Sequence, residues 1–220
     1  MTWAVERWRG TAAAFHARAW PEPLERAVWV CEPAGPALVL GSGQRDEVVD
    51  EGAARRAGIP VVRRRSGGGA VLVEPGRVLW LDVLVPHDDP LWEHDVGRAF
   101  LWLGDAWAGA LRALGVDARV HTGGLVRTEW SDLVCFGGVG SGEVLTPSGA
   151  KLVGISQRRT RAGARFQCQA LGAWAPEDLL ALLDLDPGER ADAALDLRAR
   201  AAGVGVPLGA LLTQLLAHLP

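Results

Sequence analysis

The sequence lacks the segments that place a protein in a membrane or on nucleic acid. No window of uncharged apolar residues approaches the length needed to cross a bilayer. The first ten residues, MTWAVERWRG, do not contain the apolar core of a signal peptide. The formal net charge is -3 and no dominant basic block exists, which argues against a nucleic-acid partner. These absences predict a cytoplasmic protein that needs neither nucleic acid nor membrane.

Cysteine is scarce and is spaced in a way that excludes two common roles. The three cysteines are Cys31, Cys135 and Cys168. An odd number at wide spacing makes a poor disulfide framework. The absence of a Cys-x-x-Cys pair argues against a zinc site, and we expect no metal site.

Lysine is nearly absent, because Lys151 is the single lysine among 23 basic residues. Arginine replaces lysine in most surface roles, but it offers neither a compact ammonium charge nor a readily shifted pKa. A lone lysine is therefore a better functional candidate than an average lysine. The alternative is that one lysine survived by chance in an arginine-rich composition.

The chain has 220 residues, of which 49% are hydrophobic, enough to bury a real core. We expect one catalytic domain over residues 1–220, with a helical C-terminal part at 175–220. Hydrophobic periodicity predicts helices over 11–20, 47–57, 95–114 and within 176–220, and strands over 22–30, 37–40, 59–63, 70–73, 78–85, 119–121, 133–136, 142–145, 151–156 and 164–171. This order favours an α+β fold with a mixed, largely antiparallel sheet and packed helices.

A glycine-rich loop is the first candidate site. Arg63, Arg64 and Arg65 run into the sequence Ser66-Gly67-Gly68-Gly69 between two predicted strands. Successive glycines let the backbone approach a ligand closely, exposed N–H groups make an anion-binding concavity, and arginine adds charge-assisted hydrogen bonds. The loop is not a Walker loop, since no Gly-Lys-Ser/Thr follows. A flexible hairpin loop is the alternative interpretation.

Two further candidates lie downstream. Lys151 follows a turn, enters a predicted strand and is followed by Gly154, which leaves room for a ligand beside it. Such a lysine could hold an acyl carbonyl or a phosphate, although a solvated hairpin lysine is the commoner case. Cys135 ends a predicted apolar strand and precedes glycines. It could be a covalent nucleophile or a small core residue.

Taken together, these segments resemble the biotin/lipoate protein ligase superfamily, specifically lipoate–protein ligase A and the cysteine-type octanoyltransferases. The similarity spans roughly residues 35–170. Residues 64–71 look like the lipoate-site loop of that family, 41–44 like its earlier strand end, and 151–159 like the segment that holds its acyl-site lysine. Cys135 with Glu143 eight residues later looks like the cysteine-type pattern.

The resemblance implies an enzyme that transfers an octanoyl or lipoyl group through a Cys135 thioester. The acceptor would be a lysine on a lipoyl carrier domain of a 2-oxoacid dehydrogenase or glycine-cleavage protein, and an acyl carrier protein could be the donor. Lys151 and Cys135 would be catalytic. Lys151 and backbone N–H groups near Gly68 and Gly69 would stabilise the oxyanion, while Val71 and Leu152 would line an acyl tunnel. The expected substrate-binding residues are Arg64, Arg65, Ser66, Gly67, Gly68, Gly69, Ala70, Val71, Gly154, Ser156 and Gln157.

Two alternatives remain at this point. An ATP-dependent ligase would pass lipoyl-adenylate to the carrier, would require ATP and magnesium, and would use Arg64, Arg65 and Lys151 to hold the adenylate phosphate. A non-catalytic lipoate- or acyl-binding protein is the other alternative. It is suggested by departures from the family pattern, with Val73-Glu74 in place of histidine-aspartate and Cys168-Gln169 in place of histidine-glycine.

Overall fold

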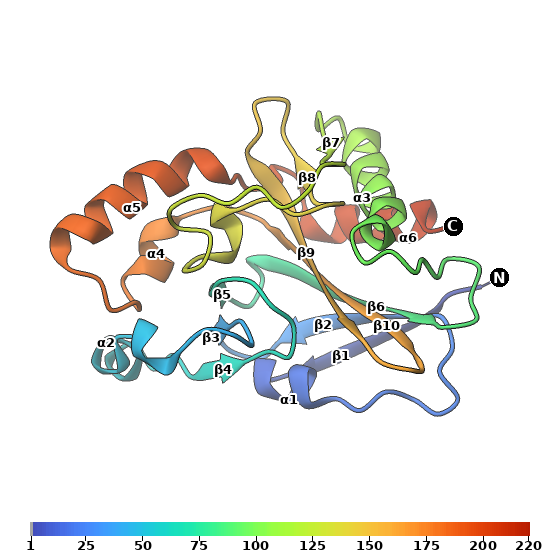
Figure 1. Cartoon of the computed structure of the whole chain (residues 1–220), viewed down its shortest axis with the longest axis horizontal. Coiled ribbons are helices and arrows are strands. Elements are labelled where there is room, and N and C mark those ends of the chain that lie inside the picture. Colours follow the sequence, from blue (N-terminus) through green and yellow to red (C-terminus); the bar gives the residue numbers. More distant parts are fainter. Residues whose placement is uncertain (1) are drawn as a thin grey trace.

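Two β-sheets that face one another form the centre of the computed structural model, which describes residues 2–220 (Figure 1). The larger sheet has seven strands in the order β1-β2-β6-β10-β9-β8-β7, and the smaller has three in the order β4-β3-β5. The large sheet contains β1 Ala4–Gly10, β2 Ala27–Pro33, β6 Val78–Pro86, β7 Arg119–Val120, β8 Val144–Leu145, β9 Lys151–Arg159 and β10 Gly163–Leu171. The small sheet contains β3 Ala37–Leu40, β4 Val61–Arg63 and β5 Val71–Val73.

Pairing within both sheets is mostly antiparallel. Only β1 with β2 and β3 with β4 run parallel, whereas β2, β6, β10, β9, β8 and β7 pair antiparallel in succession. The predicted α+β fold with a mixed, largely antiparallel sheet is therefore confirmed.

Most of the helices cover the outer faces of the two sheets, and the first one brings His16 to the cavity between them. The helices are α1 Ala12–Ala17, α2 Glu51–Arg56, α3 Leu101–Ala113, α4 Pro176–Leu180, α5 Pro187–Arg200 and α6 Leu208–His218. Helices α3 and α6 share one hydrophobic cluster with the large sheet, to which Leu81, Trp107 and Leu215 belong. Helices α4 and α5 share another with the small sheet, to which Leu40, Leu180 and Leu197 belong. This arrangement leaves the inner faces of both sheets turned toward each other.

Alternation along the central strands decides which side chains reach the space between the sheets. Gln167 and Gln169 on β10 pair in register with Ser156 and Gly154 on β9, and side chains two apart share a face. Cys168 lies between the two glutamines and faces the other way, into the cluster with α3. Ser156, Gln167 and Gln169 thus form a polar stripe that faces the small sheet.

Several predicted elements differ from those observed. Residues 133–136 do not form a strand, because Cys135–Gly137 is a short 3-10 turn and Val134 makes only an isolated bridge to Ala70. Helices α2 and α3 begin at Glu51 and Leu101, each after a short 3-10 turn. Strand β1 was not predicted, because its side chains are almost all exposed and give no apolar signal.

Candidate functional site

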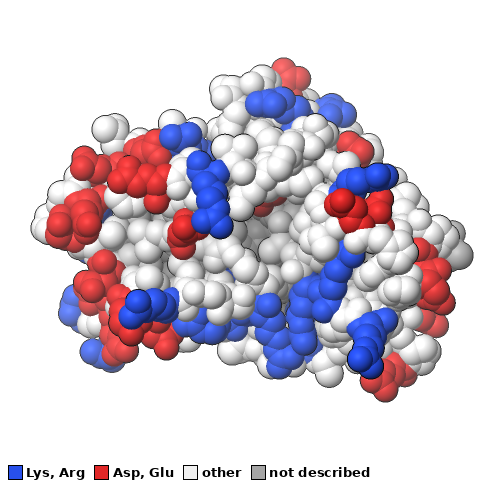
Figure 2. Space-filling model, in the orientation of Figure 1, with Lys and Arg blue, Asp and Glu red and all other residues white. Residues whose placement is uncertain are grey.

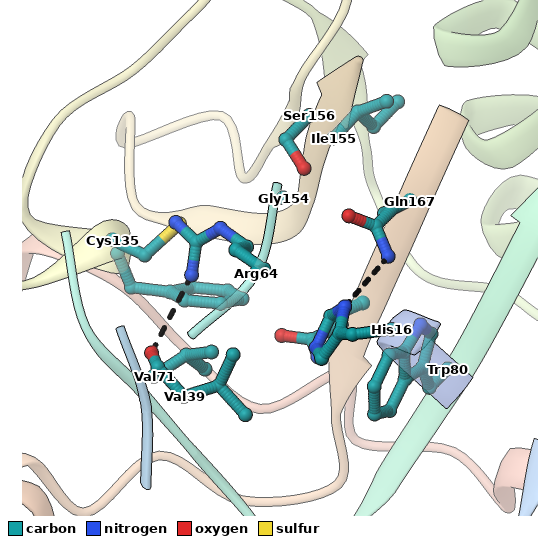
Figure 3. A pocket seen from close by; sticks show the side chains of 12 residues that line it. His16, Val39, Arg64, Val71, Trp80, Cys135, Gly154, Ile155, Ser156 and Gln167 are labelled. Carbon is teal, nitrogen blue, oxygen red and sulfur yellow. Dashed lines mark hydrogen bonds between the residues drawn. The ribbon is translucent and has the colours of Figure 1, made fainter. Parts of the chain in front are cut away.

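A cavity between the two sheets brings the glycine loop, the Cys135 turn and strands β9 and β10 together (Figure 3). Val39 and Val71 of the small sheet form its apolar side, and Gln167 and Gln169 of the large sheet form its polar side. The free volume is about 30 Å³, room for about two water molecules. A longer ligand must therefore displace side chains that now close the cavity.

Cys135 lies at one end of this cavity and is half-buried. Its backbone N–H donates to the Ala70 carbonyl at 2.9 Å, and the Ala70 N–H donates to the Leu133 carbonyl at 2.8 Å. The glycine loop and the cysteine turn are therefore held to each other by backbone hydrogen bonds. The sulfur is positioned by this clasp and not by a strand, as the sequence had suggested.

Glycines make the approach of these two segments possible. A Cβ on Gly69 would lie 2.6 Å from backbone atoms of Val134, and a Cβ on Gly41 would lie 1.8 Å from the Gly68 carbonyl oxygen. Gly68 has φ +95°, a left-handed conformation that favours glycine. Within residues 2–220, the Gly68 and Gly69 N–H groups donate to no carbonyl. Two free peptide donors thus lie beside the cysteine turn.

Arg64 supplies a buried positive charge on the wall beside Cys135 (Figure 3). Only 5% of the residue is exposed. Its guanidinium donates to the carbonyls of Gly67 and Gly69, both at 2.8 Å, and pairs with no carboxylate among the described residues. Since these partners are neutral, the positive charge is not cancelled and favours negative charge that develops nearby.

Lys151 lies behind the cysteine turn and is only 1% exposed. Its Nζ donates to the Cys135 carbonyl at 2.8 Å and forms an ion pair with Glu143 Oε2 at 2.8 Å. The other carboxylate oxygen of Glu143 accepts the Ile155 N–H at 3.0 Å. The predicted trio of Cys135, Glu143 and Lys151 is thus brought together. In this conformation, however, the ammonium holds the turn and does not line the cavity.

The other predicted binding residues divide between the cavity and its surroundings. Arg64, Val71, Gly154 and Ser156 line the cavity, and Ser66 donates to Gln167 beside it. Gly67 and Arg65 are exposed, Ala70 is buried at the clasp, and Gln157 accepts from Arg159 outside the cavity. Leu152, predicted to line an acyl tunnel, instead packs between the large sheet and its helices.

Three residues that sequence reasoning missed also shape this region. The Gln44 side chain accepts the Gly41 N–H and donates to the carbonyls of Asp132 and Leu133. It therefore holds the segment before Cys135 in place. Its place in the family-like stretch 41–44 was the available signal. His16 and Gln167 line the cavity from α1 and β10. Their neighbours in sequence gave no indication of this role.

Basic side chains gather outside the cavity. Arg65 is exposed and Arg158 is partly exposed, and neither forms an ion pair within residues 2–220. Burial, followed by the charges of Arg65 and Arg165, lowers the pKa of Arg158, so these guanidiniums lie close enough to repel one another. Figure 2 shows a band of basic side chains below a hollow in the centre of this face. Such a band attracts an anionic partner.

Comparison with known proteins identifies the family of this chain. The family model described as the lipoyl protein ligase A/B catalytic domain matches residues 6–194. The chain belongs to this family. It is 32% identical over 126 residues to octanoyltransferase LipM of Moorella thermoacetica, an overlap of 56% of this chain and 45% of that protein. The chain thus aligns with less than half the length of this curated relative.

Solved structures show the same fold. A bipartite lipoate protein ligase of Thermoplasma acidophilum superposes with a TM-score of 0.77 at 22% identity, covering 99% of this chain and 82% of that one. A lipoate–protein ligase A solved with ATP gives 0.67 at 20% identity, covering 99% and 83%. A Thermoplasma acidophilum protein solved with lipoic acid gives 0.70 at 18% identity, covering 99% and 84%. The resemblance seen in the sequence is confirmed at the level of family and fold.

At the two departures from the family pattern, Glu74 and Cys168 lie away from the cavity, whereas Gln169 lines it. Glu74 pairs with Arg77 at 2.8 Å on the turn after β5, and Cys168 is fully buried on the opposite face of the large sheet. Burial raises the pKa of the Cys168 thiol, and burial together with the charge of Asp82 raises that of Cys31. Both thiols therefore fit the core role, and Gln169 is the altered residue that reaches the cavity.

No helix among the described residues is long and apolar enough to cross a membrane.

Proposed function

We propose that this protein transfers an octanoyl or lipoyl group to a lysine of a lipoyl carrier domain, with Cys135 carrying the acyl group as a thioester. The observation that carries this proposal is the position of Cys135. This half-buried residue lines a cavity with apolar walls at Val39 and Val71. The same cavity wall holds the uncancelled charge of Arg64. The other two thiols are fully sequestered in the core.

The chemistry proceeds in two balanced steps. The Cys135 sulfur attacks the carbonyl of an acyl thioester, the bond to the donor sulfur breaks, and the donor leaves as a thiol. A lysine of the carrier domain, after losing its proton, then attacks the new thioester, and Cys135 leaves as the acyl–amide bond forms. Both steps pass through a tetrahedral oxyanion, which needs hydrogen-bond donors fixed in advance.

Donors for that oxyanion are present beside Cys135. The N–H groups of Gly68 and Gly69 have no carbonyl partner within residues 2–220, and Arg64 adds positive charge. Lys151 acts one step further away, because it fixes the Cys135 carbonyl. In this proposal Lys151 sets the position of the nucleophile, and a change of rotamer would be needed for direct contact with the acyl group.

The basic band near the cavity suits the proposed partners. The proposed acyl carrier protein and lipoyl domain would both meet this band, which attracts acidic groups on a partner. Arg65 and Arg158 have no carboxylate partner in the described chain. They are free to pair with such groups, and their contribution should weaken with salt.

The test uses purified protein and octanoyl acyl carrier protein, with intact-mass measurement after mixing. We expect one octanoyl group on the wild type and none on Cys135→Ala. Cys168→Ala is the matched control, because Cys168 is fully buried on the other face of the sheet. An adduct that persists in Cys135→Ala would refute the covalent route. Pyrophosphate release from ATP that depends on lipoate would instead support adenylation.

A second measurement addresses the acceptor. The isolated octanoyl-protein intermediate is mixed with a lipoyl domain or with the same domain in which its acceptor lysine is replaced by arginine. We expect transfer only to the lysine form, without added ATP. Absence of transfer to any lipoyl domain would refute the proposed acceptor even if the thioester forms.

A further inference from the structure

The turn after strand β3 connects to both segments that form the proposed site. Residues 41–44 make this turn, in which the Gln44 N–H donates to the Gly41 carbonyl at 3.2 Å. The Ser42 N–H donates to the Ser66 carbonyl at 2.9 Å, so the turn is joined to the glycine loop. Residues 41–44 lie outside the lining of the cavity. Any part that they play in the reaction is therefore indirect.

The turn supports the glycine that lies against the Cys135 sulfur. A Cβ on Gly68 would lie 3.7 Å from Cys135 Sγ, so this glycine is a direct neighbour of the sulfur. Figure 3 shows Arg64 beside the same cysteine. On its other side, the Gly68 carbonyl packs on Gly41, where a Cβ would come within 1.8 Å of the oxygen. The position of Gly68 relative to the sulfur therefore depends on the turn.

The Gln44 side chain ties the turn to the segment that precedes the nucleophile. Its Oε1 accepts the Gly41 N–H at 2.9 Å, and its Nε2 donates to the carbonyls of Asp132 and Leu133 at 3.1 and 3.0 Å. The Leu133 carbonyl also accepts the Ala70 N–H at 2.8 Å. One oxygen, two residues before the cysteine, is thus held both from the turn and from the glycine loop.

A primary amide of this length suits these three partners. It offers an acceptor oxygen and two N–H donors on one planar group, and here the oxygen and the nitrogen are both used. A carboxylate of the same length would have no donor, and an ammonium would have no acceptor.

Arg63 holds the turn itself. Its guanidinium donates to the Gly41 carbonyl at 2.9 Å and to the Gln44 carbonyl. One planar group therefore fixes both ends of the turn. The next arginine, Arg64, lies on the cavity wall instead. Neighbouring residues of the arginine run thus support the site in two different ways.

We propose that Gln44 is a positioning residue for acyl transfer. It holds the Cys135 sulfur where a thioester carbonyl under attack places its oxygen on the N–H groups of Gly68 and Gly69. Gln44 does not line the cavity, so it acts through the backbone of residues 132–133. The inference rests on the proposed function, because it takes Cys135 as the nucleophile.

The expected effect falls on the rate of the chemical step. A displacement of about 1 Å can slow a reaction by about 100-fold, because the attacking atom and the oxyanion donors no longer meet the same carbonyl. The Cys135 N–H retains the Ala70 carbonyl when Gln44 is replaced, so the displacement should be partial. We expect a loss of about tenfold.

Single-turnover formation of the thioester from octanoyl acyl carrier protein tests this role, with quenched samples measured by intact mass at several donor concentrations. Gln44→Met keeps the length of the side chain and loses all three hydrogen bonds. The maximal rate should fall about tenfold, whereas the donor concentration at half the maximal rate should stay within about twofold. Gln214→Met, at a partly buried glutamine of α6, is the matched control and should change neither value.

A second substitution separates the two ends of the amide. Gln44→Glu keeps an acceptor for the Gly41 N–H and loses both donors to residues 132–133. It should be as slow as Gln44→Met, since the donors hold the segment before the cysteine. A maximal rate equal to that of the wild type would overturn the assignment.

Urea denaturation shows which variants are folded at the assay temperature. A lower free energy of unfolding with an unchanged maximal rate would mean that Gln44 has a structural role only, and would overturn the inference. If Gln44→Met does not fold, Arg63→Met tests the same turn and should also lower the maximal rate. An unchanged rate there would likewise overturn the inference.

The outcomes also separate this inference from the proposed function. A thioester that forms equally fast on wild type and Gln44→Met refutes the role of Gln44 alone. A wild type that forms no thioester refutes the proposed function, and this inference with it.

Discussion

His16 illustrates how one buried residue couples the cavity to stability. Its pKa is lowered from 6.5 to about 3, so between these pH values the unfolded chain binds a proton that the folded chain does not. The contribution of His16 to the free energy of unfolding is therefore at its full value above pH 6.5 and is lost as the pH falls toward 3. The full effect is on the order of 5 kcal/mol.

We therefore predict a specific acid sensitivity. Between pH 7 and pH 4.5, the free energy of unfolding of the wild type should fall by about 2 kcal/mol more than that of His16→Gln. Urea denaturation at the two pH values measures the difference, and His87→Gln serves as the exposed control. Equal losses in wild type and His16→Gln would show that His16 is solvated.

Lys151 and Glu143 form the second residue-scale unit. Their side chains are 2% and 6% exposed, and removing one partner of a buried pair leaves the other uncompensated. Lys151→Met should lower the free energy of unfolding by about 3 kcal/mol. The double variant with Glu143→Gln should lose less than the sum of the single losses, as a double-mutant cycle would reveal. Additive losses would mean that the two groups do not interact.

At the scale of elements, the clasp between the glycine loop and the cysteine turn depends on Gly69. A Cβ there would lie 2.6 Å from Val134, with backbone on both sides. Gly69→Ala should therefore displace the turn and destabilise the protein by about 2 kcal/mol. Because the turn carries Cys135, the rate of Cys135 alkylation should also change. Chemical denaturation and iodoacetamide kinetics followed by mass measurement check both effects.

A glycine in the same loop provides the stability control for that experiment. A Cβ on Gly67 would have nothing within 4 Å, so Gly67→Ala should leave the free energy of unfolding nearly unchanged. Equal destabilisation by both substitutions would indicate a general intolerance of the loop, and not the predicted close approach.

Elements also show how far the sequence alone could lead. Strands β3 and β6 are largely apolar runs and β10 alternates polar with apolar residues, so local patterns predict all three. Strand β1 is exposed over nearly its whole length, and the Cys135 turn is held by contacts with the distant residues Ala70 and Gln44. Neither feature has a local signature. The site was predicted where a motif recurs in a family, and His16 was missed because only the fold brings α1 to β10.

At the scale of the whole molecule, α6 belongs to the same hydrophobic cluster as the large sheet. We predict that residues 1–220 are one domain. Removing a buried side chain of α6 should then destabilise the whole chain in a single transition. Leu215 is fully buried, whereas Leu195 on α5 is 70% exposed. Leu215→Ala should cost about 3 kcal/mol and Leu195→Ala almost nothing.

Thermal unfolding followed by circular dichroism and by tryptophan fluorescence tests this prediction. Both probes should report one transition that shifts together in Leu215→Ala. Two separate transitions, of which only one moves, would divide the chain into independently folding parts and correct the single-domain prediction.

The burial of Lys151 bears on whether the protein can acylate its own side chains. Under the proposed function, the protein would carry a reactive acyl group that could modify its own surface amines. This sequence contains one lysine, and its ammonium is held under the cysteine turn by Glu143. No lysine side chain is therefore exposed on the surface to react with an acyl group. Under native conditions, amine-directed reagents should likewise leave every side chain of this protein unlabelled.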